Sequence, residues 1–207
     1  MSALVASSGG IWRILAALSL VLAGMSACSQ PPAASTPTSG DGNTAQGGAT
    51  MKLTVRSTAF DGGARIPKQQ TGEGPDTSPA LSWSEAPAGT AELALIMDDP
   101  DAPQKEPWVH WVLYKVPKGT TALPEALAKT ETLKDPAGAL QGKNSFGRIG
   151  YNGPMPPPGH GTHHYHFKVY ALDQALVLAP GATKAQLLDA MRGHILAEGE
   201  LIGTYSR

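Results

Sequence analysis

The sequence has a single cysteine, Cys28, and nearly equal numbers of acidic and basic side chains. One thiol cannot form a disulfide within the chain, and there are no paired cysteines to hold zinc. The 16 lysines and arginines against 17 aspartates and glutamates leave no basic excess of the kind that binds nucleic acid. The composition therefore excludes a disulfide-stabilised domain and a paired-cysteine zinc domain, and we expect no nucleic-acid partner.

Several short motifs that carry chemistry are also missing. The sequence contains no His-Glu-x-x-His metal motif, no Gly-x-Ser-x-Gly nucleophile turn and no phosphate-binding P-loop. Four of the six histidines lie within residues 160–166, but the neighbours His163 and His164 would point to opposite faces of a strand. We therefore expect no metal, no cofactor and no catalytic residues.

The N-terminal residues are typical of an export signal. Residues 11–23 are mostly apolar but too short to span a bilayer comfortably, as in the hydrophobic part of a signal peptide. The segment Leu-Ala-Gly-Met-Ser-Ala-Cys that ends at Cys28 resembles a bacterial lipoprotein signal, in which the cysteine is lipidated and becomes the mature N-terminus. Met25 departs from the usual leucine of that motif. The alternative is an ordinary secretory signal in which Cys28 has no special role.

A polar linker follows the cysteine. Residues 30–50 are rich in Pro, Ala, Ser, Thr and Gly and carry one charge, Asp41, so they cannot bury apolar surface and predict a flexible tether. The predicted organisation is a signal peptide at 1–27, a lipidated cysteine and linker at 28–50, and a folded domain at 51–207. We expect an exported protein held at the bacterial cell envelope by a lipid anchor. By resemblance to lipoprotein sorting, Ser29 favours the outer membrane in a Gram-negative cell.

The folded region is divided by many glycines and prolines, 24 and 18 in the whole chain. Closely spaced strands without helices between them predict a mainly β fold with an antiparallel core. The apolar and alternating runs predict strands at 51–57, 78–83, 92–97, 109–116 and 163–172, a short strand and loop within 139–147, and one helical turn at 124–129.

The pattern changes to a helical period near the C-terminus. Thr183 and Gln186 have the spacing of a capping box, and apolar residues from Leu187 to Leu196 would share one side of a helix that covers the core. Gly199 is a suitable helix terminator. Residues 201–205 form a last apolar segment, which is either a strand or the end of the helical region.

An acidic, proline-rich turn follows the strand at 92–97. The prolines at 100 and 103 restrict the backbone around Asp99 and Asp101 to extended or turning conformations. Carboxylates at the end of a buried strand are costly unless they are paired, so this turn predicts a site. Of the turn residues, Asp99 is the candidate for the site, whereas Pro100, Asp101 and Pro103 are predicted to hold the turn.

Two later segments supply further candidates for the same site. His110 lies in the next predicted strand, where simple alternation places it on one face with Trp108, Val112 and Tyr114. His163 and Tyr165 share a strand face after the stiff Gly- and Pro-rich segment 150–161. Partly protonated imidazoles, a phenol and glycine backbone N–H groups make an anion receptor, and a nearby carboxylate would raise the histidine pKa values. The alternative is that each of these residues is structural.

These residues resemble the motifs of the phosphatidylethanolamine-binding protein family, and of its bacterial, Raf-kinase-inhibitor-like branch in particular. The motif Asp-Pro-Asp-Ala-Pro begins at Asp99, a histidine follows in the next strand, and Gly-Tyr-x-Gly-Pro-x-Pro-Pro-x-Gly-x-x-x-His-x-Tyr spans residues 150–165. The resemblance implies an antiparallel β-sandwich with short peripheral helices and a C-terminal helix. It also implies a pocket for phosphate-like anions that is formed by Asp99, His110, Gly153, His163 and Tyr165. Met155 replaces a second loop glycine at the pocket mouth.

We therefore expect a non-enzymatic, membrane-tethered protein that binds a small phosphate-containing or other anionic ligand. An inhibitor or regulator of a protease or kinase, with a protein partner, is the first alternative. A weak hydrolase that uses an Asp/His pair as acid and base is the second.

Overall fold

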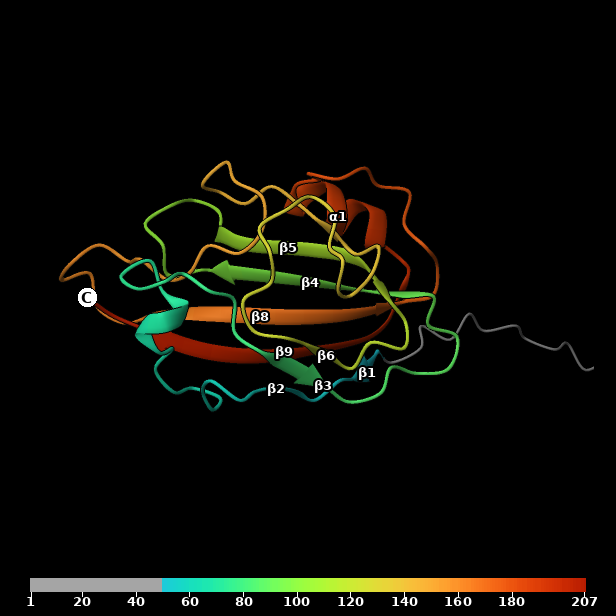
Figure 1. Cartoon of the computed structure of the whole chain (residues 1–207), viewed down its shortest axis with the longest axis horizontal. Coiled ribbons are helices and arrows are strands. Elements are labelled where there is room, and N and C mark those ends of the chain that lie inside the picture. The colour runs from blue at the N-terminus through green and yellow to red at the C-terminus, as the bar shows by residue number, and fades with distance from the viewer. Residues whose placement is uncertain (1–49) are drawn as a thin grey trace, which may run out of the picture. The chain divides into compact units, whose positions relative to one another are not determined.

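The structure is a computed structural model that describes residues 50–207 (Figure 1). The predictions for the signal peptide, for Cys28 and for the linker up to residue 49 lie outside these residues. The described elements are β1 (Met51–Lys52), β2 (Val55–Ser57), the 3-10 helix η1 (Lys68–Gln70), β3 (Leu81–Trp83), β4 (Glu92–Asp99), β5 (Trp108–Pro117), β6 (Ala122–Leu123), β7 (Leu140–Gln141), β8 (His163–Leu172), α1 (Lys184–Met191) and β9 (Ile195–Tyr205).

These strands form two sheets. The larger has the order β1-β9-β8-β4-β5-β7, and the smaller has the order β2-β3-β6. Neighbouring strands are antiparallel in both sheets, except that β1 runs parallel to β9. The mainly β fold is confirmed, and the long strands β8, β4 and β5 lie next to one another at the middle of the larger sheet.

Strand β4 separates two apolar layers because its residues alternate between the faces of the sheet. Leu95 and Met97 are buried in the main core with Phe167, between the two sheets. Ala94 and Ile96 belong to a second apolar cluster, which α1 covers. All eight residues of β4 are buried, so the end of this strand presents side chains to two different environments.

The predicted first strand is two strands in different sheets. β1 pairs with β9 in the larger sheet, and β2 pairs with β3 in the smaller one. The chain crosses between the sheets at Leu53 and Thr54: the Leu53 N–H donates to Glu198 O, whereas Thr54 O accepts from the Ser84 N–H. The alternation of residues 51–57 indicated a strand but could not show that its two halves have different partners.

The C-terminal helix is shorter than predicted. The capping box at Thr183 and Gln186 is present, and Leu187 and Met191 are buried, but α1 ends at Met191. Ile195 and Leu196 were predicted on this helix and instead begin β9. Gly193, with φ +80°, turns the chain at the end of the helix. Gly199 is therefore not a helix terminator.

The predicted helical turn at 124–129 is absent, and the pair Ala122–Leu123 forms strand β6 just before it. The alanine-rich composition of this segment favoured a helix. Ala126 has φ +59°, which a helix does not allow, and its N–H donates to Ser78 O. A contact with a distant segment therefore overrides the local preference.

The carboxyl of Glu92 is buried at the start of β4, and its burial can be tested through the pH dependence of stability. Burial raises the pKa of this carboxyl, against backbone N–H groups of Leu176 and Lys115 that lower it. Its Oε1 has no hydrogen-bond partner among the described residues. A carboxyl whose pKa is raised by folding contributes stability that is present at low pH and is lost as the pH rises through the folded-state pKa. Glu92→Gln is therefore expected to raise the Tm relative to wild type at pH 7, and to raise it less at pH 4.

The control is Glu85→Gln, because Glu85 is exposed. We expect this variant to change the Tm by the same small amount at both pH values. Thermal unfolding followed by circular dichroism measures both variants. If Glu92→Gln changed the Tm equally at pH 4 and pH 7, the pKa of Glu92 would not be raised by burial.

Candidate functional site

A cavity of about 210 Å³ lies beside the end of β4. It is lined by Asp99, Ala102, Pro103, Gln104, Trp108, His110, Phe146, Met155, Pro156, Pro157, His163 and Tyr165. These residues come from β4 and the turn after it, from β5, from β8 and from two loops. Five of the six predicted ligand-binding residues are among them, and Gly153 is the exception.

Two adjacent aspartates at the end of β4 point to opposite faces of the sheet. Asp98 faces the helix side, where it pairs with the ammonium groups of Lys184 and of Lys168, the latter at 3.4 Å. Asp99 lines the cavity on the other face. Strand alternation thus gives one carboxylate to the packing of α1 and the next to the candidate site.

Asp99 is buried, and each of its two carboxylate oxygens accepts a hydrogen bond. Its Oδ1 accepts from the Asp101 N–H at 2.9 Å, and its Oδ2 accepts from His163 Nδ1 at 2.8 Å. Asp101 instead accepts from the N–H and the Nδ1 of His164 at the start of β8. Pro100 lies in the same turn, and Pro103 also lines the cavity. The geometry places Asp99 in the cavity and Asp101 in the connection between the turn and β8.

A β-bulge lies between β4 and β5 at this point. Met97 pairs with Trp111, but the next residue, Asp98, pairs with Val109, so that two residues of β5 oppose one residue of β4. The additional residue is His110. Such a bulge reverses the alternation of side chains along the strand.

The bulge places His110 in the cavity. Val112 and Tyr114 belong to the layer under α1, whereas His110 lines the cavity with Trp108 and packs edge-on against Tyr165, with ring centroids 5.1 Å apart. The prediction that His110 shares a face with Val112 and Tyr114 is wrong. Without the bulge, its imidazole would point away from His163 and Tyr165.

His110 is buried and donates a hydrogen bond from Nδ1 to the carbonyl of Asn152, at 2.6 Å. A carbonyl can only accept, so this contact places the proton on Nδ1. Burial lowers the pKa of His110, against the smaller raising effects of Asn152 and Asp99. Asp99 thus raises the pKa of His110 as expected, but burial outweighs this effect, so His110 presents a neutral imidazole to the cavity at neutral pH.

His163 and Tyr165 follow each other on the same face of β8. His163 bonds through Nδ1 to Asp99, and through Nε2 to Nδ1 of His160 at 2.8 Å. Burial, and then the Asp99 carboxylate, raise the pKa of Tyr165 far above its ordinary value, so its hydroxyl stays neutral. The polar part of the cavity thus combines one carboxylate, two imidazoles and one phenol.

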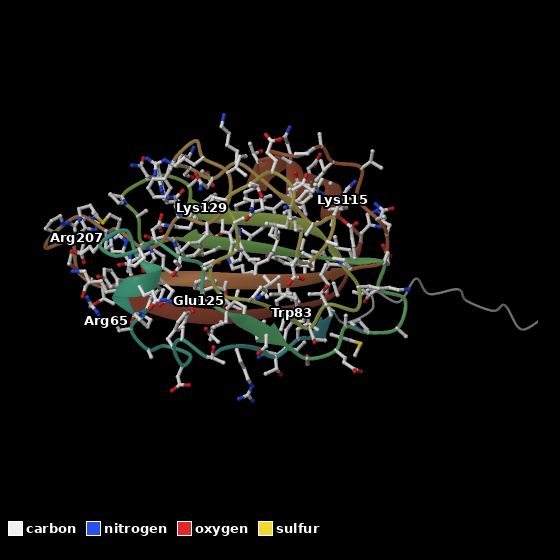
Figure 2. The ribbon with its side chains drawn as sticks, in the orientation of Figure 1. Arg65, Trp83, Lys115, Glu125, Lys129 and Arg207 are labelled. Atoms are coloured by element: carbon white, nitrogen blue, oxygen red, sulfur yellow. The ribbon has the colours of Figure 1, made fainter. Side chains whose placement is uncertain are left out.

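Gly153 does not line the cavity. Its N–H donates to Asp76 Oδ1 at 2.6 Å, and a Cβ at this position would lie 2.1 Å from the carbonyl oxygen of Gln70. Asp76 also pairs with Lys129, which Figure 2 labels. The predicted ligand contact is therefore corrected to a packing role: Gly153 allows the loop to lie against the Gln70 backbone.

Apolar side chains surround the mouth of the cavity. Phe146 and Met155 are 39% and 43% exposed, and Phe146 packs edge-on against Trp108. The lining residues Gln104, Phe146, Pro156 and Pro157 were not identified from the sequence. No periodic pattern marks them, because they lie in loops that the fold brings together.

Arg207 holds the loop that carries Met155. Its guanidinium lies 3.3 Å from Glu73 and donates to Pro156 O, and its backbone oxygen accepts from the Gly159 N–H. Figure 2 shows Arg207 at the same end of the molecule as Arg65, whose guanidinium lies over the Tyr205 ring. The end of the described chain therefore supports one wall of the site.

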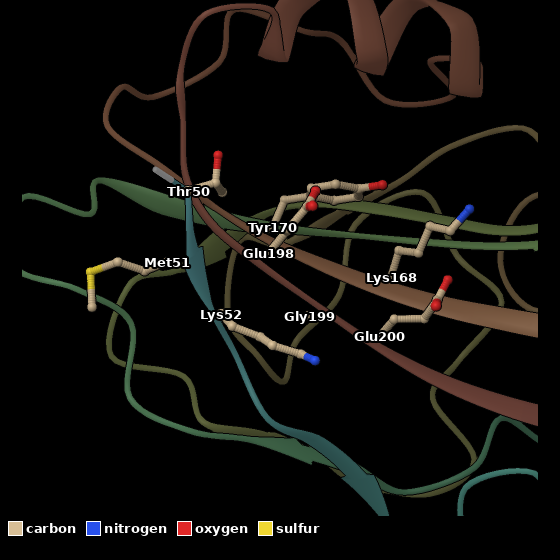
Figure 3. A pocket seen from close by; sticks show the side chains of 8 residues that line it. All are labelled: Thr50, Met51, Lys52, Lys168, Tyr170, Glu198, Gly199 and Glu200. Atoms are coloured by element: carbon tan, nitrogen blue, oxygen red, sulfur yellow. The ribbon is translucent and has the colours of Figure 1, made fainter. Parts of the chain in front are cut away.

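A larger cavity, of about 610 Å³, lies where β1, β9 and β8 meet (Figure 3). Its lining is made of cross-strand pairs: Lys168 opposite Glu200, and Tyr170 opposite Glu198, with Lys52 contributed by β1. Opposite charges face each other there. Within residues 50–207, no set of three or more His, Cys, Asp or Glu side chains is arranged to hold a metal ion.

The fold and the site together define a class: a two-sheet β domain with a carboxylate, two imidazoles and a phenol around one small pocket. The chain belongs to the phosphatidylethanolamine-binding protein family, whose model matches residues 56–206. The UPF0098 protein PH1269 of Pyrococcus horikoshii is 45% identical over 162 residues, which cover 78% of this chain and 81% of that protein.

A solved structure and a second relative extend this comparison. YbcL of E. coli, described as a member of the mammalian family, superposes with a TM-score of 0.70 at 33% identity, over 75% of this chain and 98% of YbcL. A Mycobacterium tuberculosis protein, LppC, whose name marks it as a candidate lipoprotein, is 43% identical over 74% of this chain and 72% of its own length. Among residues 50–207, the one α-helix is too short to cross a bilayer.

Proposed function

We propose that this protein is a non-enzymatic binding protein whose pocket takes a small phosphoester or other anionic group of the kind found in a phospholipid head group. The observation that carries the proposal is the convergence of Asp99, His110, His163 and Tyr165 around one cavity of about 210 Å³. Family membership supports the same ligand class.

The polar groups of the pocket favour a ligand with both an acidic and a basic part. Asp99 supplies a negative charge that suits an ammonium group. The phenol of Tyr165 is a donor for a phosphate oxygen, whereas the Nε2 atoms of His163 and of neutral His110 can each accept a bond. The apolar rim at Phe146 and Met155 adds a surface for the non-polar part of the ligand. A phosphorylethanolamine-like group satisfies all of these contacts.

The proposed location is the bacterial cell envelope, where lipidated Cys28 would anchor the domain. The signal-like N-terminus and the likeness to LppC support this location. A tether through residue 50 would let the pocket reach ligands near the membrane surface. A protein partner that binds at the rim would be excluded or released by the same ligand.

Isothermal titration of the protein with phosphorylethanolamine, and separately with inorganic phosphate, tests the pocket at pH 6. Tyr165→Phe removes one hydroxyl and is expected to weaken binding about tenfold, because one hydrogen bond to a charged group is lost. The matched control is Tyr170→Phe on the opposite face of β8, which is expected to leave the Kd unchanged.

Three results would contradict the proposal. Wild-type protein that binds neither compound would exclude this ligand class. Equal weakening by both tyrosine variants would place the ligand elsewhere. Release of phosphate from phosphorylethanolamine during the titration would show an enzyme rather than a binding protein.

A further inference from the structure

The imidazole of His163 has no free ring nitrogen. Its Nδ1 bonds to Asp99 and its Nε2 bonds to Nδ1 of His160, both at 2.8 Å. The Asp99 carboxylate accepts, so His163 Nδ1 carries a proton. Nε2 is therefore the only nitrogen through which His163 could bind a ligand, and His160 occupies it.

His160 differs from His163 in burial. The side chain of His163 is 2% exposed, whereas His160 is an exposed residue of the loop that precedes β8. Asp99, His163 and His160 thus form a chain of hydrogen bonds from the interior to the surface. Of these three residues, His160 lies nearest the surface, and its side chain can move into solvent without opening the core.

The backbone beside His160 is suited to such a movement. Gly159 and Gly161 flank it with φ values of +74° and +93°, and no atom lies within 4 Å of a Cβ built at either glycine. The backbone N–H of His160 makes a local turn contact with Pro157 O. The neighbouring Gly159 N–H bonds to Arg207 O, so the anchored part of the loop ends just before His160.

We propose that His160 is a displaceable latch of the pocket, whose imidazole occupies the Nε2 of His163 that would otherwise accept a hydrogen bond from a P–OH group of a bound phosphate anion. Anion binding then breaks the contact between His160 and His163, and His160 turns out to solvent. This inference rests on the proposed function, because it assumes that the pocket binds an anion. It assigns His160 a role in setting the affinity for the anion, because His160 competes with the ligand for Nε2 of His163 and does not itself contact the ligand.

The test compares inorganic phosphate binding to wild type, His160→Ala and the control His194→Ala. His194 is another histidine that bonds to a carboxylate, that of Asp173, but it lies outside the pocket. Removing a competing hydrogen bond of about 1 kcal/mol is expected to tighten phosphate binding about fivefold in His160→Ala. His194→Ala is expected to bind as wild type does. His160→Gln, which keeps hydrogen-bonding groups, is expected to lie between wild type and His160→Ala.

A second readout follows the imidazoles directly. In ¹⁵N-detected NMR of wild type, phosphate is expected to move the Nδ1 signal of His160 to that of a solvent-exposed histidine while the Nε2 signal of His163 changes. Unchanged or weaker phosphate binding by His160→Ala, with wild type still binding, overturns the latch alone. Absence of phosphate and phosphorylethanolamine binding by wild type and by His160→Ala overturns the proposed function together with the latch.

Discussion

Gly153→Ala is expected to destabilise the domain by about 3 kcal/mol or more, because the new methyl group has no space. Its Cβ would lie 2.1 Å from Gln70 O and 2.8 Å from Thr71 Cα, and both are backbone atoms that no rotamer change can move. Relief requires the loop to shift, which breaks the bond between the Gly153 N–H and Asp76. Urea denaturation measures the loss in the free energy of unfolding.

Gly119→Ala is the control for this substitution. No atom lies within 4 Å of a Cβ at Gly119, and its φ lies outside the left-handed region. We expect a change of less than about 0.5 kcal/mol. If Gly153→Ala were as stable as Gly119→Ala, the loop would not be packed against Gln70 as described.

Asp99→Asn is expected to cost about 2 kcal/mol of stability and at least tenfold in affinity for phosphorylethanolamine. The carboxylate accepts two hydrogen bonds, from the Asp101 N–H and from His163 Nδ1. An asparagine has one acceptor oxygen, so its NH₂ group would face one of the two donors. The charge that suits an ammonium group is lost as well. Urea denaturation and isothermal titration give the two quantities.

Asp98, the residue before Asp99, provides the matched control for Asp99→Asn. Asp98 is equally buried but pairs with Lys168 and Lys184 on the helix side of the sheet. Asp98→Asn is expected to lower stability without changing the Kd. Equal losses of affinity in the two variants would indicate that Asp99 acts through folding alone and makes no contact with the ligand.

Local patterns were sufficient for most of the secondary structure. The alternation that begins at His163 predicted the strand β8, and the Thr183–Gln186 spacing predicted the start of α1. The capping box depends on interactions between residues that are close in sequence, and the strand is visible in the sequence because its residues alternate between buried and more exposed positions. The mainly β fold followed from the spacing of strands between prolines and glycines.

The errors have a common physical cause, because each depends on a partner that is distant in sequence. The bulge at His110 is defined by pairing with Met97 and Asp98, and the role of Gly153 is defined by the backbone of Gln70. Ile195 and Leu196 fit a helical spacing, but pairing with β8 makes them a strand. One sequence contains no direct information about such partners.

The same distinction applies to the candidate site. Asp99, His110 and His163 were identified because a carboxylate after a strand, or a histidine within one, is unusual in itself, and Tyr165 because it shares a strand face with His163 and belongs to the family motif. Phe146 and His160 lie in loops, and only the fold brings them to the other residues. The sequence therefore indicated the polar residues of the pocket and Met155 at its rim, but it did not indicate Phe146 or the contact between His160 and His163.

The position of β9 has a consequence for biosynthesis. This strand is the last of the described elements, yet it lies inside the larger sheet, between β1 and β8. A nascent chain that has not reached residue 195 lacks one of the two partners of β8, and it lacks Leu201 and Tyr205 from the main core. Pairing of Met51 with Ala197 also joins segments that are far apart in the sequence. A chain that stops before residue 195 would therefore leave β8 with an unpaired edge and could not complete the larger sheet.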